Sequence, residues 1–194
     1  GESGHRHPDA LNLVLFANGE EVFPGTGSPG YGHSSYRQWF SQTIAHNTVT
    51  LNQNSQRIYP WAKELEWGYA GGGLSVVQSH ATARALQADP HLLTNAVPIQ
   101  LRRTLVMLPS CIVDITRSET DYRADSPRGD VPETIQDMAL HLNGELTMEG
   151  EWTPFDESLI AEENILTKDR APNQGYDLIE EVQVAKNPSS TRGR

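Results

Sequence analysis

The chain has 194 residues, of which 37% are hydrophobic and one, Cys111, is a cysteine, so it is long enough for one domain with a substantial core and cannot form an internal disulfide. Its formal net charge is −10 and no Lys/Arg cluster interrupts the acidic background, which argues against nucleic acids and anionic membranes as partners. No apolar run approaches the roughly 20 residues of a membrane span.

A pair of histidines, His5 and His7, precedes the first apolar run, residues 11–16. The run predicts a strand, and histidines that already lie in it would share one face of the sheet. Pro8 cannot donate to a strand ladder, so it predicts an edge, a bulge or the start of the strand. Two polar surface residues are the usual interpretation of such a pair. Here a third histidine, His46, follows in another strand-like run, residues 43–49, and indicates a candidate site.

The dipeptide Asn18-Gly19 is the next signal, and it predicts an antiparallel hairpin between residues 11–17 and 21–23. Residues 25–33 then form a glycine-rich loop. This loop contains neither GxxxxGK[ST] nor GxGxxG, the glycine-rich patterns of nucleotide-binding loops. The helix that a phosphate site needs is also missing, so we do not predict a nucleotide site.

Aromatic residues and an arginine come at the end of this loop. Residues 36–40 predict either a short helical turn or the approach to the next strand, and they include Arg37, Trp39 and Phe40. Together with Tyr31, this cluster suits carbohydrate binding, because rings stack on sugar faces and a guanidinium binds a carboxylate with two parallel hydrogen bonds. A packing role for Trp39 and Phe40 at the edge of a sandwich is the alternative.

The rest of the chain predicts further strands and no long helix. Residues 81–88 have a helix-friendly composition but could equally continue the strand before them, and residues 122–133 predict a surface loop. We expect an all-β, antiparallel fold, most simply a β-sandwich. The predicted strands are residues 44–51, 74–80, 97–108, 112–117, 138–142, 145–148 and 178–184, with a turn at Pro109-Ser110.

These segments resemble the heparinase II/III-like polysaccharide lyases, and within that group the oligoalginate-lyase branch. The resemblance is strongest over residues 4–11, the Asn18-Gly19 turn, the loop ending in Tyr31-Gly32, and residues 45–49. It implies that residues 1–194 are the C-terminal β-sandwich portion of a lyase and end before the sandwich is complete. The N-terminal (α/α) toroid would lie outside this sequence, with the active site in the cleft between the two parts.

The resemblance also implies roles for single residues. In the family pattern the first histidine takes part in catalysis, which points to His5. The second histidine and the one in the later strand bind zinc, which points to His7 and His46. The remaining metal ligand is an aspartate, and Gly25 stands in its place. Either another carboxylate completes the zinc site, with Glu20, Glu21 and Asp9 nearest in the sequence, or zinc binds with reduced affinity, which we favour. From the aromatic and arginine pattern described above, Tyr31 and Arg37 are the candidate substrate-binding residues.

The activity that the resemblance implies is β-elimination of uronic-acid-containing glycans, alginate-type or glycosaminoglycan, to a 4,5-unsaturated product. A base removes the C5 proton, and the adjacent carboxylate opposes enolate formation, so its neutralisation is the main electrostatic task. A charged imidazole at ~4 Å in an effective dielectric of ~20 contributes up to ~4 kcal/mol. His5 is expected in this role, or as the base when neutral. A periplasmic or secreted location is favoured over a cytoplasmic one.

Two other functions stay open. The chain could be a non-catalytic β-sandwich that binds carbohydrate or a partner, because the metal aspartate is missing. A metal-dependent hydrolase built on His5, His7 and Asp9 is disfavoured, because Asp9 follows His7 across a proline and no HExxH motif accompanies them. An upstream (α/α) repeat with an Asn-His pair and a cleft tyrosine would support the lyase.

Overall fold

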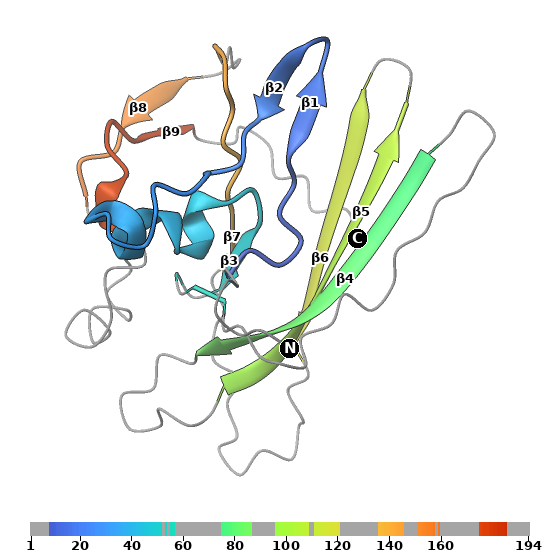
Figure 1. Ribbon diagram of the computed structural model, residues 1–194, viewed down its shortest axis with the longest axis horizontal. Helices are drawn as coiled ribbons and strands as arrows, with labels where there is room; N and C mark the ends of the chain where they lie inside the picture. Colours follow the sequence, from blue (N-terminus) through green and yellow to red (C-terminus); the bar gives the residue numbers. More distant parts are fainter. Residues whose placement is uncertain are drawn as a thin grey trace.

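The computed structural model describes residues 8–51, 53, 55–56, 75–86, 96–108, 111–120, 136–145, 151–157, 159 and 175–185. Within these ranges the chain is mostly strand, paired antiparallel, with a few short helical turns (Figure 1). The all-β class is therefore confirmed for the described residues, and the sandwich stays a prediction. No helix in these ranges is long and apolar enough to cross a membrane.

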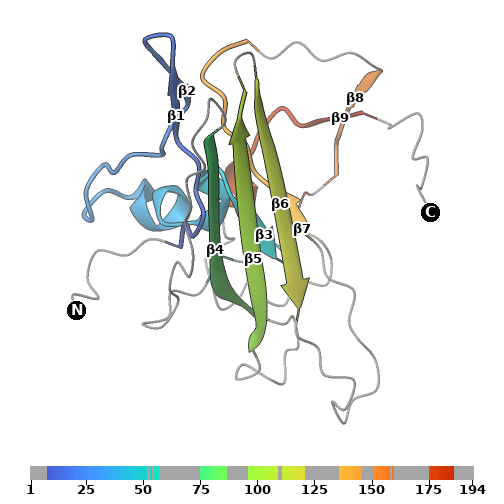
Figure 2. The ribbon, with the colours of Figure 1, turned by 90° about the vertical axis from the view of Figure 1, so that its right-hand side faces the viewer.

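The largest sheet has three strands in the order β4 (Ser75–Leu86), β5 (Ala96–Met107) and β6 (Ile112–Thr120). It confirms the predicted hairpin at residues 97–117, and β4 continues through the segment that could have been helical. Pro109 and Ser110 lie outside the described residues. Figure 2 shows these long strands side by side in front of the smaller elements.

The first hairpin pairs β1 (Leu15–Ala17) with β2 (Glu20–Phe23). Asn18 and Gly19 both have positive φ, 54° and 86°, as a two-residue turn of the right twist requires. The prediction that the strand already runs from Leu11 is wrong. Leu11 has a φ of 62°, and the Asn12 amide donates to the Asp9 carbonyl at 2.9 Å, so a turn precedes β1.

A second correction concerns the predicted strand at residues 43–51. Thr43–Ala45 forms a helical turn, η2, and the strand β3 covers only Val49–Leu51. His46 is therefore not in a strand. The side chains of Thr43, Asn47 and Thr48 bond main-chain atoms of distant segments, and such bonds compete with a regular ladder. The helical-turn option for residues 36–40 is confirmed by η1 (Tyr36–Phe40).

Two small sheets complete the described part. β3 pairs with β7 (Gln136–Met138), and β8 (Trp152–Pro154) pairs with β9 (Gln183–Ala185). The strand predicted at 138–142 thus lies earlier, and β8 was not predicted. The strand predicted at 178–184 is confined to its end, because Tyr176–Leu178 forms a helical turn, η4. Residues 122–133 and 146–148 lie outside the described residues.

The core of the described part is unusually polar. Every residue from 42 to 50 is buried, although most of these side chains carry hydrogen-bonding groups. Such groups are stable in a core only when they are bonded. The buried apolar residues are Ile44, Ala45, Val49, Leu101 and Tyr176, and the buried polar residues are Gln42, Thr43, His46, Asn47, Thr48, Thr50, Gln56 and Arg103.

Candidate functional site

His46 is the described member of the predicted histidine set, and it is only 5% exposed. Its Nδ1 lies 3.0 Å from the Thr26 hydroxyl, so the glycine-rich loop fixes the orientation of the ring. Histidine ligands of metals commonly hold one ring nitrogen in a hydrogen bond of this kind and bind the metal through the other. His5 and His7 lie outside the described residues, so their predicted roles stay predictions.

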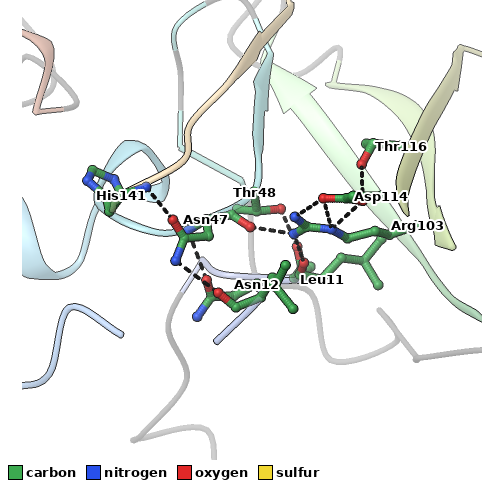
Figure 3. A network of polar contacts seen from close by, with 10 residues as sticks. Leu11, Asn12, Asn47, Thr48, Arg103, Asp114, Thr116 and His141 are labelled. Atoms are coloured by element: carbon green, nitrogen blue, oxygen red, sulfur yellow. Dashed lines mark hydrogen bonds and ion pairs between the residues drawn. The ribbon is translucent and has the colours of Figure 1, made fainter. Parts of the chain in front are cut away.

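Asn47, the next residue, is bonded on every side (Figure 3). Its side-chain amide donates to the carbonyls of Leu13, at 2.9 Å, and Pro24, at 3.1 Å. Its Oδ1 accepts the main-chain amide of His141 at 2.5 Å, and its own amide donates to Asn12 Oδ1 at 2.8 Å. The residue beside His46 is therefore fixed to three separate segments, around Leu13, Pro24 and His141.

Threonines and a glutamine bind the chain that follows His7 to the chain around His46. The Thr43 hydroxyl donates to the Pro8 carbonyl at 2.6 Å, and the Thr48 hydroxyl donates to the Ala10 carbonyl at 2.7 Å. Gln56 accepts the Ala10 amide at 2.9 Å. Residues 8–10, directly after His7, are thus anchored to the segment that contains His46.

The two predicted substrate-binding residues lie at the surface on one continuous stretch of chain. Tyr31 is 57% exposed, and its ring meets that of Tyr36 edge-on, with centroids 5.0 Å apart. Arg37 is exposed in η1, and its carbonyl accepts the Gln42 side-chain amide at 2.5 Å. Trp39 is half-buried and packs edge-on against His141, which fits the packing alternative for this aromatic.

The described residues do not by themselves form a zinc site. Among them, no group of three or more His, Cys, Asp or Glu side chains gathers closely enough to hold a metal. His46 offers one suitable nitrogen. A Cβ added at Gly25 would meet Val14 Cγ2 at 3.5 Å, an ordinary contact. Zinc therefore stays a prediction that depends on His7.

A second buried polar cluster lies at the β3–β7 sheet. Tyr176, 6% exposed, donates its hydroxyl proton to Asp137 Oδ2 at 2.6 Å and lies 2.5 Å from the Thr50 hydroxyl. Burial, and then the hydrogen bond to Asp137, raises the pKa of the Tyr176 hydroxyl above its ordinary value. In this cluster the Tyr176 hydroxyl is a hydrogen-bond donor that connects η4 to β7.

Sequence reasoning assigned no role to Asn47, or to Arg103, whose guanidinium donates to the Asn47 carbonyl and pairs with Asp114. One signal was available for Arg103, because it lies between Leu101 and Leu105 on a strand where the two-residue period places it on the same face as these leucines. No comparable signal identified Asn47, since its partners are main-chain atoms of distant segments.

Comparison with known proteins gives the class of this chain. The profile of the family "Heparinase II/III-like, C-terminal" matches residues 1–110, more than half of the chain, and the chain therefore belongs to this family. The matched range contains all the predicted site residues, namely His5, His7, Tyr31, Arg37 and His46. No solved structure matches the chain significantly.

Three relatives are lyases by name. The chain is 39% identical over 62 residues to the exo-oligoalginate lyase of Saccharophagus degradans, which covers 27% of this chain and 8% of that protein. It is 40% identical over 55 residues to the heparin-sulfate lyase of Bacteroides stercoris, and the match covers 26% of this chain and 8% of that protein. It is 25% identical over 180 residues to the alginate lyase of Stenotrophomonas maltophilia, covering 83% and 22%. The chain thus spans less than a quarter of each relative.

Proposed function

We propose that this chain is part of a polysaccharide lyase that cleaves uronic-acid-containing glycans, alginate-type or glycosaminoglycan, by β-elimination to a 4,5-unsaturated product. The observation that carries the proposal is the family match over residues 1–110, which contains every candidate site residue. The names of three relatives support the reaction class. The buried, fixed position of His46 supports a site in this part of the chain.

In this proposal the chain supplies only part of the active site. His5 neutralises the uronate carboxylate as an imidazolium, or removes the C5 proton when it is neutral. Arg37, exposed in η1, pairs with a carboxylate of the glycan, and the exposed ring of Tyr31 stacks on a sugar face. The remaining acid/base groups come from an N-terminal (α/α) toroid domain of the parent chain, outside this sequence.

The role of His5 is tested in the full-length protein. We expect His5→Ala to lower kcat by about two decades or more, as loss of one electrostatic stabiliser does. His91→Ala is the matched control, because His91 has no partner at ligand spacing in the sequence. The ultraviolet absorbance of the unsaturated product, measured with alginate, heparan sulfate and hyaluronan oligosaccharides, reports both rate and substrate class. Unchanged turnover in His5→Ala would remove His5 from the mechanism.

We also propose that His7 and His46 bind zinc, with a lower affinity than a site that also has the aspartate of the family pattern, because Gly25 supplies no carboxylate. The anchoring of His46 Nδ1 by Thr26 supports this, since histidine ligands commonly use their second nitrogen for such a bond. When bound, zinc would supply positive charge near the substrate carboxylate. His7 and His46 would hold the zinc ion in place.

Elemental analysis before and after mild chelation tests the zinc site. We expect His46→Ala to lose metal and thermal stability together. We expect Gly25→Asp to retain zinc against a chelator better than wild type, because it adds the missing carboxylate at a position where a Cβ meets only an ordinary contact. Wild-type protein that contains no zinc, and whose melting temperature zinc does not change, would contradict the proposal.

A non-catalytic carbohydrate-binding domain is the second candidate. It is favoured by the exposed Tyr31 and Arg37, together with the lack of a complete metal-ligand group among the described residues. Under this alternative, the full-length protein binds uronate oligosaccharides in calorimetry, binding weakens in Arg37→Ala, and no unsaturated product forms. Detectable elimination decides for the lyase.

A further inference from the structure

Arg103 is a buried arginine at the junction between the large sheet and the segments of the candidate site. Its side chain is 3% exposed, and it pairs with Asp114 of β6, whose side chain is 25% exposed. Nε lies 3.0 and 3.1 Å from the two carboxylate oxygens, and Nη2 donates to Oδ2 at 2.5 Å. This two-pronged geometry fixes the plane of the guanidinium.

The other end of the guanidinium contacts the two segments that contain the histidines. Nη1 donates to the carbonyl of Leu11, at 2.8 Å, and to the carbonyl of Asn47, at 2.5 Å. Leu11 follows His7 by four residues and Asn47 follows His46 directly. Figure 3 shows Arg103 reaching from its strand to both carbonyls, with Asp114 above the guanidinium.

The arginine and one of its two carbonyl partners lie in the core, since Arg103 is 3% exposed and Asn47 is fully buried. A buried carbonyl that loses its donor costs about 1–3 kcal/mol. Leu11 also keeps a left-handed φ of 62°, which a branched L-residue adopts only where its surroundings hold it.

We propose that Arg103, held by Asp114, is a positioning residue: it sets the separation between the segment after His7 and the segment of His46. The proposal rests on the proposed function for its effect on turnover. Lysine cannot reproduce it, because an ammonium cannot bind the carboxylate with two prongs and both carbonyls together. Arg102, on the opposite face of the same strand and exposed, is the matched control.

The experiment compares Arg103→Lys, Asp114→Asn and Arg102→Lys in the full-length protein. We expect Arg103→Lys and Asp114→Asn to lower kcat about tenfold with KM within twofold of wild type, at a temperature where circular dichroism shows all variants folded. Arg102→Lys should match wild type. A merely structural role would lower the melting temperature and leave kcat of the folded enzyme unchanged.

Hydrogen exchange separates this inference from the proposed function. Amides of residues 11–13 and 47–48 should exchange at least about tenfold faster in Arg103→Lys than in Arg102→Lys, whether or not the wild type is a lyase. If these amides exchange faster in Arg103→Lys but the wild type shows no lyase activity, the positioning role of Arg103 is supported and the proposed function is overturned. If exchange is unchanged in Arg103→Lys, or if the wild type is active and kcat is unchanged in Arg103→Lys, the positioning role of Arg103 is overturned. If Arg103→Lys does not fold, Asp114→Asn gives the same readouts.

Discussion

Asn47 uses its side-chain amide for three main-chain contacts, with Leu13, Pro24 and His141. The Asn47 side chain is fully buried, so its amide atoms would be unsatisfied without these contacts, which costs about 1–3 kcal/mol per group. A carboxylate at this position has the same shape but no proton to donate. The chemistry of this one side chain therefore decides whether several segments meet beside His46.

We expect Asn47→Asp to lower the free energy of unfolding by at least ~2 kcal/mol, because two buried carbonyls lose their donor and face a negative charge. Asn143→Asp is the matched control: Asn143 is exposed, and a surface substitution of this kind stays within about 0.5 kcal/mol of wild type. Urea denaturation of the two variants and the wild type measures both values. Equal midpoints for the two variants would refute the assigned role of Asn47.

At the level of elements, the β1–β2 hairpin depends on the backbone conformation of its turn. Gly19 has a φ of 86° and no heavy atom within reach of a Cβ, whereas Gly25 has no such φ and an ordinary contact at 3.5 Å. We expect Gly19→Ala to lower the free energy of unfolding by about 1–2 kcal/mol. Gly25→Ala should be neutral or slightly stabilising, because it lowers the entropy of the unfolded chain. Thermal unfolding of the two variants distinguishes a conformational cause from a steric one.

The elements that the sequence predicted correctly have local signals. Asn18-Gly19 defines one hairpin, and the long strands β5 and β6 follow from a run of β-formers around a turn. The segment at 43–51 has the same strand-like composition but folds mainly as a turn, because Thr43 and Asn47 bond residues more than 30 positions away. No pattern within the segment itself reveals those partners.

The same distinction applies to the candidate site. His46, Tyr31 and Arg37 could be selected from motifs, since each lies in a stretch with a distinctive local composition. The supporting set could not, because Arg103 reaches Leu11 across 92 positions and Asn47 across 56. Such contacts form only when the large sheet and the N-terminal segment are already side by side, as Figure 1 shows.

For the molecule as a whole, Tyr176 connects the C-terminal part to the middle of the chain. Its hydroxyl contacts Thr50, 126 positions away, and Asp137, 39 positions away. Gly175, directly before it, lies against Ile44 and Trp39 so closely that a Cβ would clash with Ile44 at 2.7 Å. The described C-terminal turn is thus a part of the same core as the candidate site.

We expect the stability of the fold to fall above about pH 10. The pKa of Tyr176 is raised in the folded state, so its contribution is complete below the unfolded value of about 10 and is lost as pH rises toward the folded pKa. The loss in the free energy of unfolding that Tyr176 causes approaches about 1.4 kcal/mol per pH unit. Tyr176→Phe should remove it while lowering stability at pH 7 by about 1–3 kcal/mol.

Tyr31→Phe is the control for this measurement, because Tyr31 is exposed. It should leave both the stability at pH 7 and the alkaline slope at their wild-type values. Urea midpoints collected from pH 7 to pH 11 provide the comparison. If stability falls with rising pH equally steeply in Tyr176→Phe and in wild type, groups other than Tyr176 cause the fall.

Because Asn47 and Arg103 bind carbonyl oxygens, they constrain the path of the chain at Leu11, Leu13 and Pro24 and leave the identity of those side chains open. This has an evolutionary consequence. The loop at residues 25–33 begins directly after the Pro24 carbonyl that Asn47 anchors, so descendants could replace residues 27–33, beyond the Thr26 that contacts His46, while keeping the anchored main chain. A chimera of the full-length protein that takes residues 27–33 from a relative should therefore fold. Under the proposed function, a change in its substrate preference would be attributable to the loop.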